Sequence, residues 1–315
     1  MPRDNSRSAA NRGGPVTRRG VLRTVAGGAL VAGSAVAGAT ATTDGGFPPN
    51  GTTRFGDEVT LGAGSVRPFT TETPAGEPRY HGVDFDREVL TGTLPSAADL
   101  AADRTGDDSE YVDKYGQSGR ALEVHHRESL EFFVPFPDAE ATPFTFLGLN
   151  WNPEGHAGAR GAWAAPHFDI HFHMLGTDTV DAIEGPDFAP YDDIPGARIP
   201  AGYERSPPAA ADERYVTDMG EHLAPSDAPE VPGNPAAFTN TLIQGFVSAD
   251  SEPELAFVEP MLTREFLRDF EGTARYEVPQ PAIYPHGKQH PTAYSVRADP
   301  AGDTVAVAIQ EFESV

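Results

Sequence analysis

The 315-residue chain contains no cysteine. Disulfide bonds and lipoprotein anchoring both need a cysteine and are therefore excluded. The sequence also has no P-loop, no G-x-G-x-x-G segment after a strand and no G-x-S-x-G nucleophile elbow. It therefore does not indicate a P-loop nucleotide hydrolase, a dinucleotide-binding enzyme or an α/β-hydrolase.

Basic residues are scarce, and only two of them are lysines. The chain has 23 basic and 47 acidic residues, for a net charge of −24. No basic stripe is available to release counterions from a nucleic acid, so we expect no nucleic-acid partner. At molar salt the Debye length is about 3 Å, so a large acidic charge serves solubility with little self-repulsion. The acidic surplus, with arginine preferred to lysine, predicts a halophilic protein.

The N-terminus has the layout of an export signal. Thr17–Arg23 contains a twin-arginine pair followed by apolar residues, and an uncharged run extends from Thr24 to Ala39. Ala39–Ala41 is a small-x-small cleavage site. This pattern predicts a twin-arginine signal peptide over residues 1–41. The run is too short and too rich in glycine for a membrane span. We therefore expect no membrane insertion after cleavage, and an extracellular or cell-surface location.

The rest of the sequence predicts a mainly β protein. Residues 42–58 are rich in Thr, Gly and Pro and are predicted to be a flexible linker. Residues 59–315 are enough for one domain. Thirty prolines and 33 glycines divide the chain into short segments. This favours a single β-rich domain, sandwich-like or barrel-like, with a few short helices and long loops. The stretch 176–211, dense in Pro, Gly and Asp, is predicted to be a long loop.

Individual elements follow from apolar periodicity and capping residues. Two helices are predicted, Ser96–Asp103 and Thr263–Phe270, each beginning at a residue whose hydroxyl can cap it. The predicted strands are Val83–Thr93, Ala121–Glu123, Leu130–Pro135, Phe144–Asn150, His167–Leu175, Asn240–Val247, Leu255–Glu259, Thr292–Arg297 and Thr304–Phe312.

The segment Pro166–Met174, P-H-F-D-I-H-F-H-M, is the most informative in the chain. Successive side chains of a strand point to opposite faces. Imidazole and carboxylate groups together suit zinc, iron, manganese, copper or nickel. Residues two apart lie about 7 Å apart along a strand and residues four apart about 13 Å. We therefore expect one ion to take neighbours, either Asp169 and His171 or His171 and His173, and to take both His167 and His171 only across a bulge. The face predicted to carry ligands comprises His167, Asp169, His171 and His173, and the apolar face comprises Phe168, Ile170, Phe172 and Met174.

Further ligands must come from other segments. The turn N-P-E-G-H directly upstream projects Glu154 and His156. We expect the His156 imidazole within about 5 Å of His167 or His171, as for two ligands of one ion. M-G-E-H offers His222. Glu259 is followed by proline, which predicts a strand end. An acid among apolar residues is costly to bury unless it is paired or binds a metal, and a salt bridge from Glu259 to a nearby arginine is the alternative.

Six motifs in order, L-N-W-N-P-E-G-H, P-H-F-D-I-H-F, M-G-E-H, F-T-N-T-L-I-Q-G, F-V-E-P-M-L-T and P-T-A-Y-S-V, carry a resemblance. From about Leu61 to the C-terminus the chain resembles an uncharacterised family of exported bacterial and archaeal proteins that is defined only as a domain of unknown function. The resemblance implies a single β-rich domain and no particular activity. It does not extend to a fixed histidine at position 173. The site positions that it implies are Glu154, His156, His167, Asp169, His171, His222 and Glu259. The segment F-D-I-H-F-H is similar in site type alone to the His-x-His strands of cupins and carbonic anhydrases.

Two hypotheses follow. The first is an exported metal-binding protein, with zinc as the first candidate ion and iron or manganese as alternatives. If it is an enzyme, it is a metal-dependent hydrolase or oxidoreductase acting on a small molecule, with Glu154 or Glu259 as general base. The second is a non-catalytic cell-envelope or extracellular module, as a homo-oligomer, with a buried His/Asp/Glu hydrogen-bond network and no small-molecule substrate. The metal ligands of the first hypothesis are His156, His167, Asp169, His171 and His222.

Overall fold

The computed structural model describes residues 46–104, 114, 128–137, 140–156, 158–185, 190–205, 215–249 and 252–315. All of these residues belong to a single structural unit. The predicted signal peptide, residues 1–41, and the predicted strand Ala121–Glu123 lie outside the described residues.

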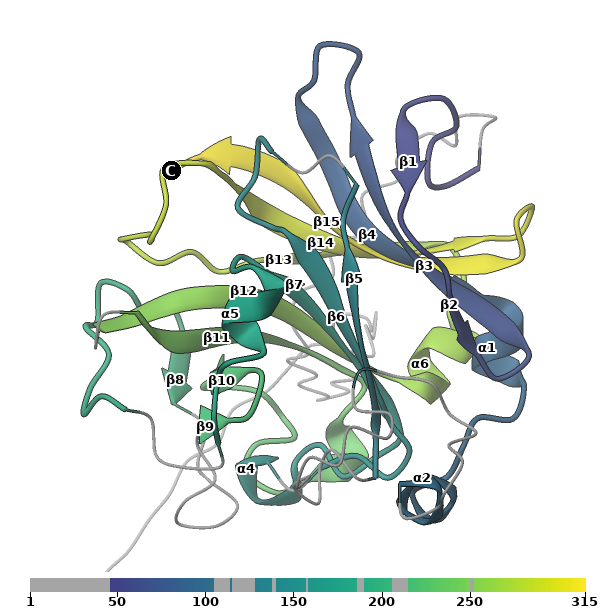
Figure 1. Cartoon of the computed structure of the whole chain (residues 1–315), viewed down its shortest axis with the longest axis horizontal. Coiled ribbons are helices and arrows are strands. Elements are labelled where there is room, and N and C mark those ends of the chain that lie inside the picture. The colour runs from purple at the N-terminus through teal and green to yellow at the C-terminus, as the bar shows by residue number, and fades with distance from the viewer. Residues whose placement is uncertain are drawn as a thin grey trace, which may run out of the picture. The chain divides into compact units, whose positions relative to one another are not determined.

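The described residues form two antiparallel sheets (Figure 1). Sheet A has the strand order β1-β3-β4-β15-β14-β13, with β2 also paired to β3. Sheet B has the order β5-β6-β7-β12-β11-β10-β8, with β9 also paired to β10. The strands of sheet A are β1 (Thr53–Phe55), β2 (Val59–Leu61), β3 (Gly64–Glu72), β4 (Pro78–Asp86), β13 (Thr273–Glu277), β14 (Gln289–Asp299) and β15 (Thr304–Ser314). Those of sheet B are β5 (Leu130–Pro135), β6 (Phe146–Asn152), β7 (His167–His173), β8 (Tyr203–Arg205), β9 (Tyr215–Val216), β10 (Gly220–Pro225), β11 (Asn240–Ala249) and β12 (Glu252–Thr263).

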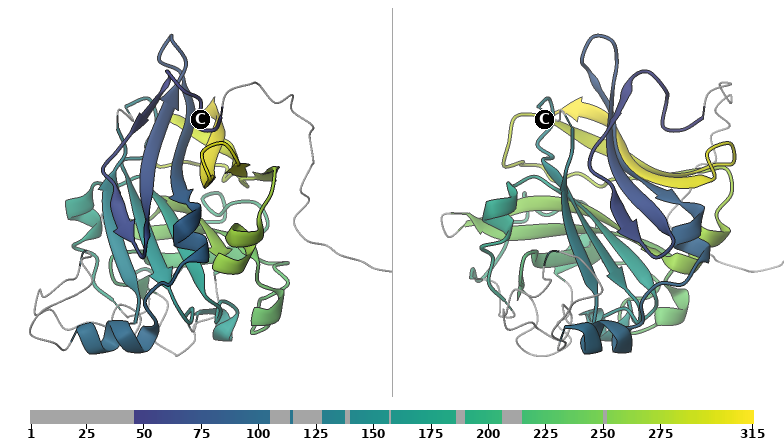
Figure 2. Two further views of the ribbon diagram at one scale, coloured as in Figure 1. Left: turned by 90° about the vertical axis from the view of Figure 1, so that its right-hand side faces the viewer. Right: turned by 45° about the vertical axis from the view of Figure 1, so that its right-hand side comes forward.

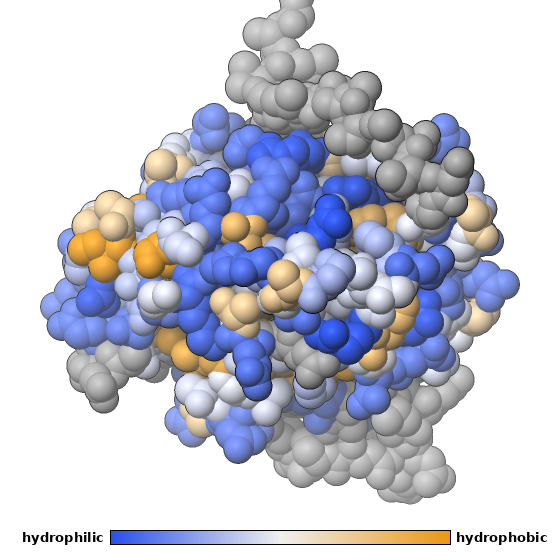
Figure 3. All heavy atoms as spheres, turned by 90° about the horizontal axis from the view of Figure 1, so that it is seen from above, coloured by the Kyte–Doolittle hydropathy of each residue, from blue (hydrophilic) through white to orange (hydrophobic). Residues whose placement is uncertain are grey.

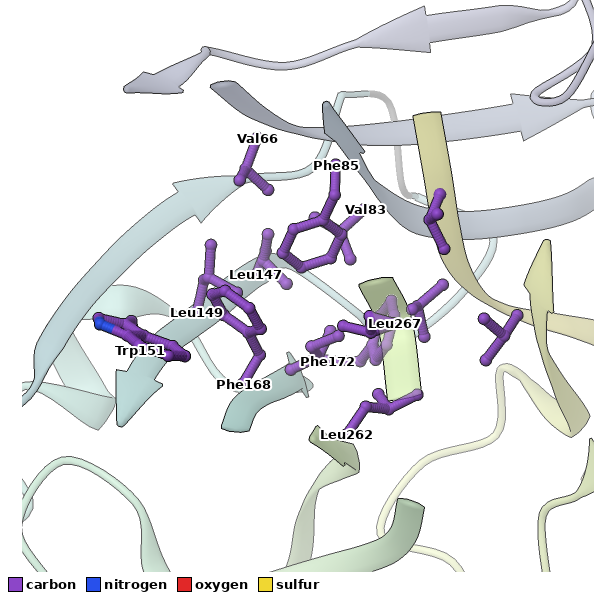
Figure 4. Close-up of a cluster of buried hydrophobic side chains, with 14 of the residues drawn as sticks. Val66, Val83, Phe85, Leu147, Leu149, Trp151, Phe168, Phe172, Leu262 and Leu267 are labelled. Atoms are coloured by element: carbon purple, nitrogen blue, oxygen red, sulfur yellow. The ribbon is translucent and has the colours of Figure 1, made fainter. Parts of the chain in front are cut away.

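The two sheets pack against each other through one apolar core. Sheet A contributes residues such as Val83 and Phe85, and sheet B contributes Leu149 and Phe168, whose ring lies 5.1 Å from that of Phe85 (Figure 4). In Figure 2 the blue and yellow strands of sheet A lie over the teal and green strands of sheet B. The prediction of a mainly β, sandwich-like domain is therefore confirmed.

Sheet A joins segments from the two ends of the described chain. Strand β15 pairs with β4, and Val307 lies opposite Val83 (Figure 1). The alternation predicted for Thr304–Phe312 is present: Val305, Val307 and Ile309 belong to the inter-sheet core. Ala306 and Ala308, from the other face, pack with Phe69. A period of two thus identified both faces of this strand correctly.

Both predicted helices are present, with the predicted caps. In α2 (Ala97–Asp103) Ser96 and Asp99 form a capping box. In α6 (Arg264–Asp269) the hydroxyl of Thr263 accepts the backbone N–H of Phe266. The strand predicted over Val83–Thr93 is wrong in its second half, because β4 ends at Asp86 and α1 (Arg87–Thr91) follows. An acidic residue in the first turn, Glu88, favours that helix N-terminus.

Two stretches predicted to be irregular contain regular structure. From residue 46 onward the predicted linker packs on sheet A, since β1 pairs with β3 and the ring of Phe47 lies 5.8 Å from that of Phe69. The predicted loop 176–211 contains α5 (Thr177–Val180) and β8. The remaining short elements are α4 (Gly158–Gly161) and a 3₁₀ turn, Pro235–Ala237.

In the described part of the chain, no helix has the length and apolar character to cross a membrane. The face drawn in Figure 3 is largely hydrophilic, with apolar residues in small scattered groups.

Candidate metal centre

Strand β7 divides its side chains between two faces, as predicted. Phe168, Ile170 and Phe172 lie in the core between the sheets. The opposite face carries the three histidines and Asp169, and these side chains are also buried, with at most 2% exposed. A second apolar cluster covers this face and includes Trp163, next to α4, and Met219. The polar face of β7 is therefore enclosed, and a strand with a solvated face is ruled out.

Two glycines leave room for the large side chains of this face. Gly148 on β6 lies opposite His171, and a Cβ at position 148 would come 2.8 Å from Nε2 of His173. Gly245 on β11 lies opposite Phe257, and a Cβ there would come 1.9 Å from the Phe257 ring. His222 on β10 pairs with Gly245 and lies beside the Phe257 ring, at 5.3 Å. A larger residue at position 148 would displace His173, and one at position 245 would displace the Phe257 ring that lies beside His222.

Two groups of potential metal ligands lie on this face among the described residues. The first is His156, His167 and Asp169. Nε2 of His167 lies 2.9 Å from Oδ1 of Asp169, and Nε2 of His156 lies 3.6 Å from Oδ2. The rings of His156 and His167 are 4.9 Å apart. The N-P-E-G-H turn therefore returns beside β7, and the expected approach of His156 to His167 is confirmed.

The hydrogen bonds of His167 orient it as a ligand. Its Nδ1 lies 2.6 Å from the carbonyl oxygen of Ala165, which can only accept a hydrogen bond, so Nδ1 carries a proton. In the neutral ring Nε2 then presents a lone pair to the Asp169 carboxylate. Two acceptors at 2.9 Å repel, so a proton or a metal ion must lie between them. A carbonyl that accepts the second ring N–H is the usual support of a metal-bound histidine.

The second group is His171, His222 and Glu259. Nε2 of His171 lies 3.4 Å from Oε1 of Glu259, and Nε2 of His222 lies 3.8 Å from Oε2. The β7–β12 register places Phe257 opposite His173 and Met261 opposite Asp169, so Glu259 lies across from His171. Nε2 of His171 and Oε2 of Glu259 are buried and have no hydrogen-bond partner among the described residues.

The spacing of the donor atoms fits one ion in each group. Ligands of a tetrahedral zinc at about 2.0–2.1 Å lie about 3.4 Å apart. The four separations of 2.9, 3.6, 3.4 and 3.8 Å lie on either side of that value. Within each group all donor atoms lie within 4.8 Å of one another. Either set can converge on an ion with small side-chain rotations.

The two carboxyl groups have opposite proton affinities. Burial alone would raise the pKa of Asp169, but the charge of His167 and the hydrogen bonds from His156 and His167 hold that pKa well below its usual range. Burial raises the pKa of Glu259 well above its usual range, and the charge of Asp169 raises it further. Without a bound metal ion, the charge of His167 therefore favours the ionised form of Asp169, whereas burial favours the protonated form of Glu259.

The histidines of the second group are neutral at physiological pH. Burial lowers the pKa of His171 to about 4 and that of His222 to about 3. The neutral imidazole is the form that binds metals. Access is greatest at the ligands outside β7 and β12, because the side chains of His156 and His222 are 20% and 17% exposed.

Not every predicted site residue joins a group. Glu154 is exposed in the turn after β6 and belongs to neither group. His173 also lies outside both; its ring stacks on Phe146 at 4.4 Å and on His171 at 5.3 Å. The predicted neighbours Asp169 and His171 fall into different groups.

The strand end predicted at Glu259 is wrong. Glu259 and Pro260 lie inside β12, which has β7 on one side and β11 on the other. The pairing of β12 with β7 is interrupted at these two residues, which accommodates a proline without an N–H. Glu259 also forms no salt bridge with Arg264, whose guanidinium donates instead to the carbonyls of Val89 and Gly92.

Two asparagines of β6 were missed by the sequence reasoning. Asn152 donates to Oδ2 of Asp169 at 2.8 Å and so orients that carboxylate. Asn150 pairs with Asp169 across the ladder and is fully buried. Neither polar atom of its amide has a partner among the described residues. The signal was available, since polar residues alternate with apolar ones in L-N-W-N just before the histidine strand.

Comparison of the chain with family models, with curated proteins and with solved structures gives no match. The resemblance to the uncharacterised exported family therefore stays a prediction, and the case for a function rests on the site itself.

Proposed function

We propose that this protein is an exported metal-binding protein that holds a divalent transition metal, zinc in the first instance, on the enclosed polar face of sheet B. The observation that carries the proposal is the second ligand group. Nε2 of His171 and Oε2 of Glu259 are buried and have no hydrogen-bond partner in the described part of the chain. Each imidazole Nε2 lies 3.4 or 3.8 Å from a carboxylate oxygen of Glu259, and burial keeps both imidazoles neutral. Buried polar atoms are rarely left unpaired in a folded protein, and a bound ion would satisfy these.

The number of ligands favours a reactive ion over a structural one. Each group supplies three protein ligands, two imidazoles and one carboxylate. Structural zinc sites use four protein ligands, whereas catalytic sites use three and leave a position for water or substrate. A zinc-bound water loses a proton near neutral pH and attacks carbonyl or phosphoryl groups. Hydrolysis of a small-molecule substrate is therefore the activity that we propose. Glu259 acts as a ligand in this scheme, and exposed Glu154 is left without a role.

The ligand type also favours a second chemistry. Two histidines and one carboxylate are the donor set of non-haem iron oxygenases, which keep open positions for dioxygen and substrate. Iron-dependent oxidation is thus the second candidate activity. Elemental analysis of the bound ion distinguishes it from zinc-dependent hydrolysis. Manganese suits the same donors and would be recognised in the same measurement.

The competing proposal is a non-catalytic module with a hydrogen-bonded His/Asp/Glu core. The first group suits that description in part, because Asp169 accepts from Asn152 and His167 donates to Ala165. The second group does not, since among the residues that the structure describes its buried atoms lack the partners that such a network would supply. We therefore favour metal binding.

Export by the twin-arginine route, to the cell surface or the medium, is part of the proposal. That route generally carries proteins already folded, some with cofactors inserted, which suits an enclosed metal site. The strongly acidic composition supports a saline setting.

Elemental analysis and metal-dependent melting test the proposal. Protein purified in high salt should contain stoichiometric metal, and removal by chelator should lower its melting temperature. Zinc at 100 times its dissociation constant should restore about 2.7 kcal/mol of stability. His171→Ala should reduce the metal content. Substoichiometric metal with no zinc-dependent shift, or a His171→Ala protein that is less stable but unchanged in metal content, would support the core-network alternative.

A further inference from the structure

The two ligand groups share no residue. Asp169 turns towards His156 and His167, whereas His171 turns towards Glu259 and His222. Each group draws on β7 and on a different neighbour: the turn after β6 serves the first, and β10 and β12 serve the second. The ligands of one ion could therefore be in place without those of the other.

One ion cannot use both groups. The side chains of Asp169 and His171, two residues apart on β7 with Cβ atoms about 7 Å apart, would share one ion only if their donor atoms turned towards each other. Their donor atoms turn towards different partners, and in each group those partners lie within 4.8 Å of one another. Metal–ligand bonds of about 2 Å keep the donors of one ion within about 4 Å. Two compact sets one strand step apart therefore describe two positions for ions.

We propose that the polar face of sheet B holds two divalent transition metal ions at once, one in each group; this inference rests on the proposed function. Each group has its own carboxylate and two imidazoles, so neither ion depends on the other for charge or ligands. One strand step, about 7 Å, is wider than the roughly 3.5–4 Å of two-metal sites that clamp one oxygen. Each ion therefore keeps its own open position.

Native mass spectrometry of the full chain loaded with Zn²⁺ or Cu²⁺, and EPR of the chain loaded with Cu²⁺, test this inference. The wild-type protein should bind two ions. His156→Ala and His222→Ala, which change partly exposed ligands of different groups, should each bind one, and the double variant should bind none. The matched control is His286→Ala, which changes a half-buried histidine between β13 and β14 of sheet A, and this variant should still bind two ions. The EPR spectrum of wild-type protein with two Cu²⁺ should be broadened by dipolar coupling, and each single variant should give a narrow spectrum.

The outcomes separate this inference from the proposed function. No bound metal in the wild-type protein contradicts both. One ion per wild-type chain, lost in only one of the two single variants, supports the proposed function and overturns the two-ion inference. Two ions without dipolar broadening place the second ion elsewhere and also overturn it. The wild-type measurements decide the question even if a variant does not fold.

Discussion

Gly148 on β6 lies opposite His171 on β7, and a Cβ at position 148 would come within 3.2 Å of the His171 Cβ. The same Cβ would come within 2.8 Å of Nε2 of His173, whose ring is held between Phe146 and His171. A glycine that presents no unusual backbone angle is thus required by the space that two histidines occupy. This close approach links the packing of β6 directly to the second ligand group.

Gly148→Ala should therefore weaken both folding and metal binding. Overpacking of a filled core typically costs about 1–3 kcal/mol. Displacement of His171 should also lower zinc affinity in the second group. Urea unfolding in chelator and zinc titration measure the two effects. Gly196→Ala is the control, since a Cβ there meets no atom within 4 Å, and it should change stability by less than about 0.5 kcal/mol. Equal behaviour of the two variants would contradict the packing argument.

Two asparagines two residues apart should respond in opposite ways to the same substitution. The Asn150 amide is buried and has no partner within the described ranges, so Asn150→Leu removes an unsatisfied group and should stabilise the metal-free protein by about 1–3 kcal/mol. Asn152 donates to Asp169, so Asn152→Leu should destabilise it. Urea unfolding in chelator compares them. A loss of stability in both variants would mean that Asn150 is satisfied, for instance by ordered water.

Two buried histidines outside the metal centre should make the protein sensitive to acid. Burial lowers the pKa values of His81 and His290 to about 3. In the unfolded chain these groups titrate near pH 6.5. Between about pH 6.5 and 3 the unfolded state therefore binds more protons, and the unfolding free energy falls as the pH falls. Each histidine contributes a slope of about 1.4 kcal/mol per pH unit well inside this window.

His290→Phe isolates one of these contributions. Neither ring nitrogen of His290 has a partner among the described residues, and its ring packs against Phe144 and Tyr284, so an aromatic replacement suits the position. The variant should lose about 1.4 kcal/mol per pH unit of the acid slope. Above about pH 7.5 the variant and the wild type should respond to pH alike. Urea unfolding in chelator at several pH values gives both slopes, and an unchanged acid slope would count against a neutral buried His290.

Local patterns predicted the faces of β7 and β15 because a strand's alternation is a property of consecutive residues. The caps at Ser96 and Thr263 were equally local. The turn at His156 returned beside β7 as its short connection indicated. What failed depended on distant neighbours. Strand β4 ends at Asp86, and α1 begins where the backbone N–H of Arg87 donates to the carbonyl of Asp303 and its guanidinium donates to the carbonyl of Phe270.

The division of the ligands into two groups could not be read from the sequence. Which way Asp169 turns is decided by Asn152 and His156, and both reach it only through the β6–β7 pairing. Glu259 was expected at a strand end because proline usually stops pairing. Its true place in a central strand depends on an interruption in the ladder with β7, which no local pattern announces.

Glu259→Gln should raise the stability of the metal-free protein and lower its affinity for zinc. Burial raises the pKa of Glu259 well above its usual range, so in the metal-free protein the folded state holds a proton that the unfolded chain releases above about pH 4.5. The folded state therefore binds more protons than the unfolded state over that window, and stability falls as the pH rises towards the folded-state pKa. Glutamine mimics the protonated acid and does not titrate.

In chelator at pH 7 the Glu259→Gln variant should be more stable than the wild type, and at pH 4 the two should be similar. With zinc the order should reverse, because the amide is a weaker ligand than a carboxylate and the second group loses its only negative charge. Thermal melting in chelator and in excess zinc, at pH 4 and pH 7, provides all the comparisons. A variant that is less stable than the wild type in chelator at pH 7 would show that Glu259 is ionised and stabilising without metal, contrary to this account.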